Sequence, residues 1–321
     1  MRIELYKDEY KHIWDSFVDE SKNGTFLHNR DYLEYHSDRF KDYSLMIFDG
    51  NDDYEDSRKE SELLALLPAN VKGDRLYSHA GLTYGGLIIS KNIGQIKVCE
   101  IFTVIRDFLK LNNFSELYYK LIPSVYHKIA ADEDQYALFS IGAKLIDRKA
   151  SSAIYQPEKL AINKRRKRGV KRAVDRGVKL SEHSDLTAYW DILTENLNAR
   201  YGKSPVHSVE EISRLQSLFP ENIKCHTVEI EGEIVAGVLM FITHSCAHAQ
   251  YISASEKGKK NNALDLLFDI LINDIYKDLR WFDFGISTEP HDFRILNEGL
   301  INQKENFGAR TIIYDSYVLN I

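Results

Sequence analysis

The stretch that decides the fold runs from residue 226 to residue 286 and reads HTVEIEGEIVAGVLMFITHSCAHAQYISASEKGKKNNALDLLFDILINDIYKDLRWFDFGI. Two apolar runs, His226–Ile230 and Ile234–Ile242, flank the pair Glu231-Gly232, and this pattern predicts a β-hairpin. Ala249–Ser253 is predicted as a third strand because apolar and polar residues alternate in it. The stretch therefore begins as an antiparallel sheet.

A long helix is predicted for Asn262–Lys277, because its polar residues recur four apart and the rest of its surface is apolar. Such a helix lies against a sheet. Trp281–Ile286 then predicts a buried strand, Phe293–Asn306 a helix and Thr311–Leu319 a closing strand.

The N-terminal half repeats this order of elements without a residue-level repeat. Its predicted strands are Leu45–Phe48, Leu63–Val71, Arg75–His79 and Glu116–Ile122, and a helix precedes the last of them. The polar segment Asp49–Glu60 is predicted as an exposed loop. We therefore predict an α/β (α+β) chain of two similar domains, 1–158 and 159–321, each with a mixed central sheet flanked by helices.

The amino-acid composition excludes several classes of protein. The 321 residues are 44% hydrophobic and 28% charged, which excludes disorder for most of the chain. The net charge of −6 argues against a generally basic protein, and we expect no DNA partner. Three widely spaced cysteines without a CxxC pair fit a reducing cytoplasm. The N-terminus has no signal-peptide pattern, and the apolar run 235–242 is too short to cross a bilayer.

The order hairpin, strand, loop, helix, strand, helix, strand resembles the GNAT acyltransferase fold. Its doubling in one chain is similar to the tandem-GNAT acyltransferases of the Fem-like, peptidyltransferase-related superfamily. Three local matches carry this resemblance: Lys120–His127 followed by Glu133–Phe139, Arg200–Ser208, and Asn297–Leu300 leading to Lys304–Arg310. The last match contains a Lys-x-x-Phe-Gly element like the one near the C-terminus of Fem-like enzymes.

The resemblance implies acyl-CoA, with acetyl-CoA as the simplest example, as the co-substrate. GNAT enzymes usually carry Gln/Arg-x-x-Gly-x-Gly/Ala before the main helix, whereas residues 255–262 here hold a single glycine. The helical arm by which some Fem enzymes engage transfer RNA has no counterpart in this sequence. Aminoacyl-tRNA stays open as the donor, and the missing arm favours acyl-CoA.

The donor site is predicted in the loop before the helix at 262. Backbone N–H groups at a helix start form an anion site suited to a pyrophosphate, and nearby lysines add positive charge. The predicted donor-binding residues are Ser253, Ser255, Lys257, Gly258, Lys259, Lys260, Asn261 and Asn262. The alternative is a solvated, lysine-rich loop.

The candidate catalytic residues lie near the C-terminus and in one loop. By resemblance Lys304 is a candidate to stabilise an oxyanion, and Glu305 lies beside it. A carboxylate or an imidazole could accept the proton of an attacking amine. Asp283, inside a buried strand, needs a partner, and His207 follows a proline in a loop. Alternatively, Lys304 and Glu305 form an exposed pair on a helix. Asp283 would then cap a neighbouring loop, and His207 would be a structural histidine.

The acceptor site is predicted from basic and aromatic residues. Eight positive charges between 164 and 176 indicate a solvated helix face, a phosphate clamp or a nucleic-acid surface. The resemblance implies acceptor contacts in the groove between the domains. The predicted acceptor-binding residues are Tyr84, His127, Arg166, Arg168 and Arg200. The alternatives for Tyr84 and His127 are a tight strand connection and a structural histidine.

The sequence therefore predicts a cytoplasmic acyltransferase with no transmembrane segment. It would transfer an acyl group from acyl-CoA to an amine or hydroxyl of a small or carrier-linked acceptor, such as a cell-envelope or surface-polysaccharide precursor. An aminoacyl-tRNA-dependent Fem-type peptidyltransferase and a non-catalytic GNAT-fold binding module are the alternatives. We expect no metal, because there is no HExxH motif and His244 and His248 lie in a predicted hairpin.

Overall fold

Apolar side chains gather into two separate cores, one in each of the two units into which the chain divides. The computed structural model describes residues 1–50, 62–183 and 185–321. The first unit comprises Met1–Lys149 with Ile313–Ile321, and the second comprises Ala150–Ile312. The boundary predicted from the sequence lay at 158/159. Most of the predicted loop at 49–60 lies outside the described residues.

The first unit contains the N-terminal strands and the last strand of the chain. Its helices are α1 (Lys11–Glu20), α2 (Arg30–Leu33), α3 (Gln95–Leu111) and α4 (Glu133–Ser140). Its strands are β1 (Arg2–Leu5), β2 (Leu45–Phe48), β3 (Leu63–Leu67), β4 (Asn70–Lys72), β5 (Arg75–Tyr77), β6 (Ile88–Ile89), β7 (Glu116–Lys120), part of β8 (Lys144–Tyr155) and most of β16 (Arg310–Asn320). Strands β1-β2-β3-β6 form one sheet, and β4-β5-β7-β16 follow one another in a second.

The core of the first unit lies where α3 covers the strands. Val98, Ile101, Phe102, Ile105 and Leu109 recur at helical spacing and are all fully buried in one cluster with residues of β2, β3 and β7. The predicted strand 63–71 is divided into β3 and β4. Strand β3 pairs with β2, whereas β4 pairs with β5 in the other sheet, because the chain turns between them at 68–69.

The second unit contains the strands predicted from residues 226–286. Its helices are α5 (Lys164–Asp175), α6 (Leu186–Tyr201), α7 (Val209–Leu218), α8 (Glu256–Lys260), α9 (Ala263–Ile270) and α10 (Glu298–Glu305). Its strands are the end of β8, β9 (Lys179–Leu180), β10 (Ile223–Ile230), β11 (Glu233–Ile242), β12 (Cys246–Ala254), β13 (Trp281–Ile286), β14 (Thr288–Glu289) and β15 (Asp292–Leu296).

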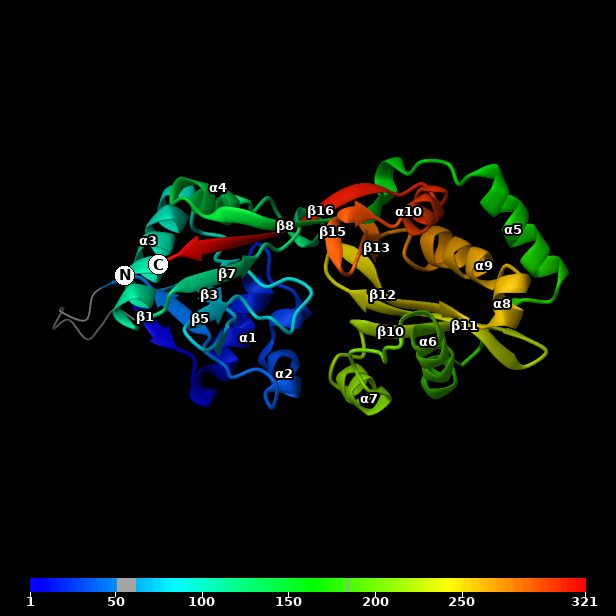
Figure 1. Ribbon diagram of the computed structural model, residues 1–321, viewed down its shortest axis with the longest axis horizontal. Helices are drawn as coiled ribbons and strands as arrows, with labels where there is room; N and C mark the ends of the chain where they lie inside the picture. Colours follow the sequence, from blue (N-terminus) through cyan, green and yellow to red (C-terminus); the bar gives the residue numbers. More distant parts are fainter. Residues whose placement is uncertain (51–61, 184) are drawn as a thin grey trace. The chain divides into compact units, whose positions relative to one another are not determined.

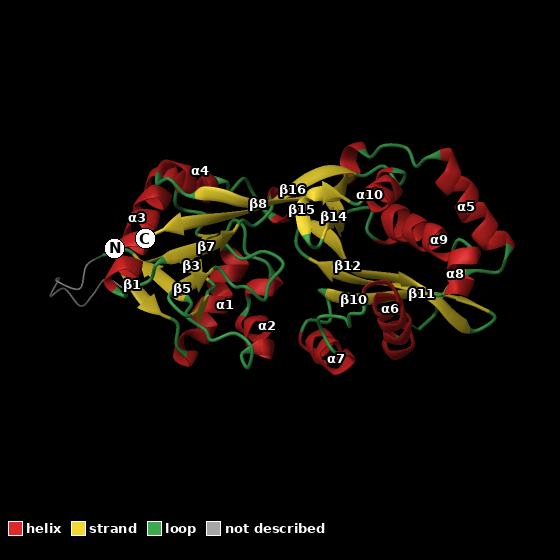
Figure 2. Ribbon diagram, in the orientation of Figure 1, coloured by secondary structure: helices red, strands yellow, loops and turns green. Residues whose placement is uncertain are grey.

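The sheet of the second unit has the order β8-β13-β12-β11-β10-β9. Strands β12 and β13 are parallel, and the β10–β11 hairpin turns at the predicted Glu231-Gly232 pair. Helices α9 and α5 lie on one side of this sheet and α6 and α7 on the other (Figures 1 and 2). Phe268 of α9 packs against Phe282 and Phe284 of β13, so the apolar face of α9 is buried, as the sequence pattern predicts.

Two of the predicted helices were wrong in their bounds. The segment expected to be a loop before residue 262 contains α8, and Asn262 separates α8 from α9 with a positive φ of 59° that asparagine tolerates. The helical path then continues as a π-helical turn, Leu271–Ile275. The predicted helix 293–306 begins only at 298, because residues 292–296 form β15 and pair with β14.

Candidate active site

Strands β12 and β13 stop pairing part-way along their length. Their register joins Cys246, Ala247 and His248 to Trp281, Phe282 and Asp283. Beyond this point β12 continues to Ala254 and β13 to Ile286 without hydrogen bonds to each other. The edge of β12 that faces β13 is therefore available to a third partner, such as an extended ligand, whereas the Gly285 N–H and the carbonyls of Gly285 and Ile286 on β13 already have partners.

A β-bulge in β12 brings polar side chains onto one face of the sheet. His248 pairs with Phe241 of β11 and Tyr251 pairs with Leu239, so the bulge inserts one extra residue between them. Phe241 and Leu239 are two residues apart on β11, so they lie on the same face of the sheet. His248 and Tyr251, which pair with them, therefore share that face. That face carries α6, because the rings of Trp190 and Tyr251 lie 5.3 Å apart.

Asp283 is the centre of a buried polar cluster at the point where the pairing ends. Its side chain is fully buried, on the face of β13 opposite to Phe282 and Phe284. The hydroxyl of Ser151 donates to Oδ1 at 2.8 Å, and the backbone N–H of Gly285 donates to the same oxygen at 2.9 Å. Nδ1 of His248 lies 2.8 Å from Oδ2. These three bonds satisfy a carboxylate that would otherwise be costly to bury.

Lys304 lies beside this cluster. Its ammonium donates to the carbonyls of Gly285 at 2.7 Å and Ile286 at 2.8 Å, at the unpaired end of β13. Burial lowers the pKa of Lys304 from 10.5 to about 8, and the nearby charge of Asp283 opposes this effect. Two of its three donors are thus used to hold the strand end. The structure brings the predicted residues Lys304 and Asp283 together.

Glu305 and His207 lie elsewhere in the second unit. Glu305 follows Lys304 in α10 but is turned about 100° away around the helix, and it is only partly buried. His207 is buried in the loop between α6 and α7, where Nδ1 lies 2.7 Å from the hydroxyl of Tyr251. Burial raises the pKa of Tyr251 to about 12, so its hydroxyl stays protonated at neutral pH.

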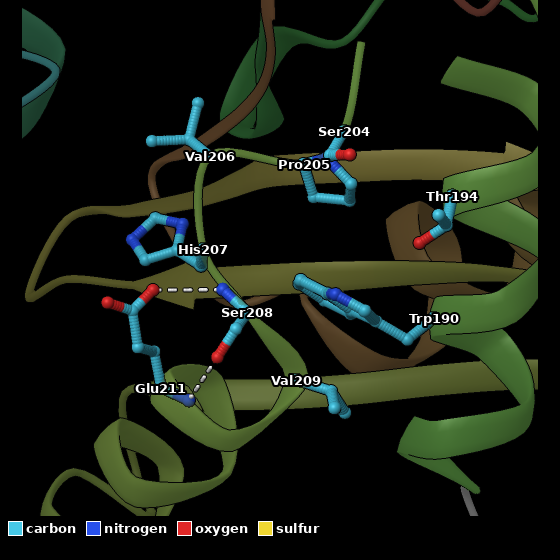
Figure 3. A pocket seen from close by; sticks show the side chains of 9 residues that line it. All are labelled: Trp190, Thr194, Ser204, Pro205, Val206, His207, Ser208, Val209 and Glu211. Carbon is cyan, nitrogen blue, oxygen red and sulfur yellow. Dashed lines mark hydrogen bonds between the residues drawn. The ribbon is translucent and has the colours of Figure 1, made fainter. Parts of the chain in front are cut away.

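A pocket of about 470 Å³ lies at this loop, on the same side of the sheet as α6. Figure 3 shows the ring of Trp190, from α6, extending toward the loop, and the two hydrogen bonds by which Ser208 and Glu211 cap α7. The pocket is lined by Trp190, Thr194, Ser204, Pro205, Val206, His207, Ser208, Val209 and Glu211. It combines an aromatic wall with hydroxyl, imidazole and carboxylate groups, a mixture suited to a polar organic ligand.

The predicted donor-binding residues follow β12 in the chain, at its open end. Ser255 caps α8 by accepting from the N–H of Gly258, and Asn196 of α6 donates to Ser253. Two of the lysines are paired with carboxylates, Lys257 with Glu233 and Lys259 with Glu256. The carbonyl of Lys260 accepts from Arg176, and the side-chain amide of Asn261 donates to the carbonyl of Lys257.

Gly258 owes its identity to packing. A Cβ at this position would lie 2.2 Å from the carbonyl oxygen of Val235 in β11, which is impossible without moving the backbone. The glycine therefore lets α8 approach the sheet closely. Its predicted role in contacting a phosphate stays a prediction.

The predicted acceptor-binding residues are scattered over both units. Arg166 pairs with Asp265 of α9 at 2.6 Å and stacks over Phe307, whereas Arg168 and Arg200 are exposed. In the first unit, Tyr84 is buried against Tyr126. His127 is buried too, with Nε2 2.9 Å from the carbonyl of Ile122. The structure does not bring these five residues into one cluster within either unit.

Sequence reasoning missed His248 and Ser151 as site residues. The sequence separates His248 from Asp283 by a long helix, and only the parallel pairing of β12 with β13 brings them together. One usable signal was present for His248, which stands between Ala247 and Ala249 next to a predicted strand. Within the described residues, no group of three or more His, Cys, Asp or Glu side chains could hold a metal ion.

Residues 161–292, which lie within the second unit, match the family model described as an acetyltransferase (GNAT) domain. This part of the chain is similar to a GNAT domain. No curated protein matches the sequence. The helices of the described segments include none with the length and apolar character needed to span a bilayer.

Solved structures extend the likeness of the GNAT domain to the whole chain. The crystal structure of FemX has a TM-score of 0.66 at 12% identity and covers 98% of this chain and 97% of that one. L-PGS from Bacillus licheniformis has a TM-score of 0.60 at 14% identity, with 99% and 92% covered. A tandem GNAT protein from the clavulanic acid biosynthesis pathway has a TM-score of 0.51 at 10% identity, with 99% and 98% covered. The predicted tandem-GNAT fold is confirmed.

Proposed function

We propose that this protein transfers an acyl group from acyl-CoA to an amine of a small or carrier-linked acceptor. The observation that carries the proposal is the end of pairing between β12 and β13 at His248 and Asp283, inside the GNAT-like part of the chain. An extended thioester arm has amide groups that can hydrogen-bond to the open backbone edge of β12. The reacting carbonyl would then lie near the polar cluster.

Residues around the opening suit acyl transfer. An amine that attacks a thioester carbonyl creates a negatively charged oxygen, and a positive group aimed at that oxygen lowers the barrier. We assign this role to Lys304, whose buried ammonium lies at the end of β13. We assign the acyl-donor phosphates to the segment 253–262, where Lys260 is exposed and adds positive charge.

Calorimetry with acetyl-CoA and longer acyl-CoAs tests the donor assignment. We expect saturable binding to the intact protein. Lys260→Glu should weaken this binding about tenfold, because hydrogen bonds to charged groups contribute roughly 1.5–3 kcal/mol. Lys110→Glu, the same charge reversal at an exposed position of α3, should leave binding unchanged. Absence of binding to every acyl-CoA would overturn the donor assignment, and binding without transfer to any acceptor would indicate a binding module.

Aminoacyl-tRNA is the second candidate donor, and the surface of α5 favours it. Gly169 and Ala173 face the core, while the opposite side exposes the cations Lys164, Arg165, Lys167, Arg168, Lys171 and Arg172. FemX and L-PGS share the fold of the whole chain. A surface of this kind binds nucleic acid with an affinity that falls steeply as salt rises.

Transfer RNA binding separates the two donors. We would measure the affinity for mixed tRNA at low and physiological salt, with the triple variant Arg165→Glu, Arg168→Glu and Lys171→Glu. Arg166 is left intact because its ion pair with Asp265 holds α5 on α9. Salt-sensitive binding that the triple variant abolishes would support the tRNA donor. Equal binding by both proteins, or none, would leave acyl-CoA as the donor.

A further inference from the structure

The pair His248–Asp283 has the geometry of an oriented base. An ionised carboxylate only accepts hydrogen bonds, so in the 2.8 Å contact Nδ1 of His248 donates to Asp283. In a neutral imidazole the other nitrogen, Nε2, is then the one that can accept a proton. Ser151 and the Gly285 N–H hold the carboxylate from its other oxygen, so both the ring orientation and the tautomer are set by the fold.

The position of the ring also suits this role. His248 is the last residue of β12 that pairs with β13, so its ring lies at the closed end of the opening between the strands. The ring of His248 lies on the α6 face of the sheet, as does the side chain of Tyr251. The hydroxyl of Tyr251 contacts His207, which lines the pocket. Nine-tenths of the residue is buried, which limits its contact with bulk water.

We propose that His248 is the proton acceptor of the transfer reaction, with Asp283 and Ser151 as its positioning residues. The inference rests on the proposed acyl transfer and deepens it. The acceptor therefore binds as a neutral amine from the α6 face of the sheet, while the acyl donor lies along the open edge of β12. Asp283 from β13 is the charged group that contacts the ring, and Lys304 from α10 lies near that carboxylate. Tyr251 lies on the same face of the sheet as His248, and His207 from the α6–α7 loop contacts Tyr251.

The proposed step balances in atoms and charge. The amine nitrogen forms a bond to the thioester carbon, and the carbonyl π pair moves to oxygen, where Lys304 faces it. Nε2 of His248 takes one proton from the resulting ammonium. The C=O bond then re-forms as the C–S bond breaks, and the imidazolium returns its proton to the leaving thiolate. The products are an amide and free CoA, and no other reactant is needed.

His248→Asn tests the proposal, because the asparagine amide can still donate to Asp283 but offers no basic nitrogen. Release of the CoA thiol from acetyl-CoA would be followed with ethanolamine, lysine amide and glucosamine as amine probes. We expect transfer to fall about 100- to 10,000-fold while calorimetry gives an unchanged acetyl-CoA affinity. His244→Asn, the same change at an exposed histidine in the β11–β12 connection, should keep the wild-type rate.

Asp283→Asn provides a second and independent variant. An asparagine amide aimed at Nδ1 would force the ring proton onto Nε2, so transfer should fall by a similar factor. The acid limb of the pH profile of kcat/KM should disappear in His248→Asn and shift in Ser151→Ala. If the buried variants fail to fold, ¹⁵N NMR of histidine-labelled wild-type protein supplies the readout, with protonated Nδ1 and unprotonated Nε2 expected at pH 8.

The outcomes separate the two proposals. Wild-type protein that neither binds nor consumes any acyl-CoA removes the acyl-transfer proposal. Wild-type protein that transfers, together with a folded His248→Asn protein that transfers at the same rate with the same pH profile, overturns the assignment of His248 alone. A wild-type ring that carries its proton on Nε2 also overturns it.

Discussion

Lys304 is a buried residue with a structural role and, as we propose, a catalytic one. Its ammonium satisfies two carbonyls at the end of β13, so the strand keeps its position after pairing with β12 has ended. Burial lowers its pKa to about 8, so the fraction that is charged changes within the physiological range. At pH values below 8 the group is mostly an ammonium, and above 8 it is mostly a neutral amine.

We predict that transfer by the wild-type protein decreases as pH rises through about 8, because the group that faces the oxyanion then loses its charge. Lys304→Met preserves the length of the side chain and removes the charge, and it should reduce kcat about 100- to 1,000-fold. Rates of thiol release from pH 6 to 10 would check both effects. An alkaline limb that survives unchanged in the methionine variant would show that another group titrates there.

At the scale of elements, α8 is held by close contact with β11. The contact depends on Gly258, whose missing Cβ leaves room for the carbonyl of Val235. The other glycine of interest, Gly299 in α10, is different, because the nearest atom to an added Cβ is 3.7 Å away. The two glycines form a matched pair, one required by packing and one merely tolerated in a helix.

We predict that Gly258→Ala lowers the free energy of unfolding by about 1–3 kcal/mol, the usual cost of overpacking. Gly299→Ala should raise it by about 0.5–1 kcal/mol, because alanine restricts the unfolded chain and favours the helix. Urea unfolding followed by circular dichroism measures both changes. Equal stability of Gly258→Ala and the wild-type protein would mean that α8 can move away from β11 at no cost.

At the scale of the whole molecule, the chain leaves the first unit at β8 and returns to it at the last strand. Residues 316–320 of β16 pair antiparallel with β7. The return is held by Arg148, which donates two 2.7 Å hydrogen bonds to Asp315, and by the 2.6 Å contact between the hydroxyls of Tyr126 and Tyr314. The first unit therefore requires residues from both ends of the chain.

We predict that deletion of residues 313–321 destabilises the first unit and exposes the edge of β7, which favours aggregation. Limited proteolysis with mass spectrometry should then find new cleavage sites within 1–149, while sites within 150–312 stay protected. Arg106→Ala is the control. It removes the exposed ion pair with Asp107 on α3 and should cost less than about 1 kcal/mol. An unchanged digestion pattern after the deletion would contradict the need for β16.

Periodicity was sufficient to predict most elements of both units, because alternation and helical spacing are properties of neighbouring residues. The hairpin at 231–232, the strand 281–286 and the apolar face of the helix at 263–270 were predicted in this way and are confirmed. The predicted bounds of helices and strands were wrong where tertiary contacts compete with the local sequence pattern. The β14–β15 pairing takes residues that were predicted as helix, and the packing of α8 on β11 orders a predicted loop.

The sequence by itself determined the fold class and the two-fold repetition of elements, and it named Lys304 and Asp283 as candidate site residues. Only the tertiary structure decided that His248 lies opposite Asp283 and that Ser151 donates to the carboxylate of Asp283. The physical reason is that strand register and the end of strand pairing arise from contacts between distant segments. No local pattern in the chain records which residues such contacts will bring face to face.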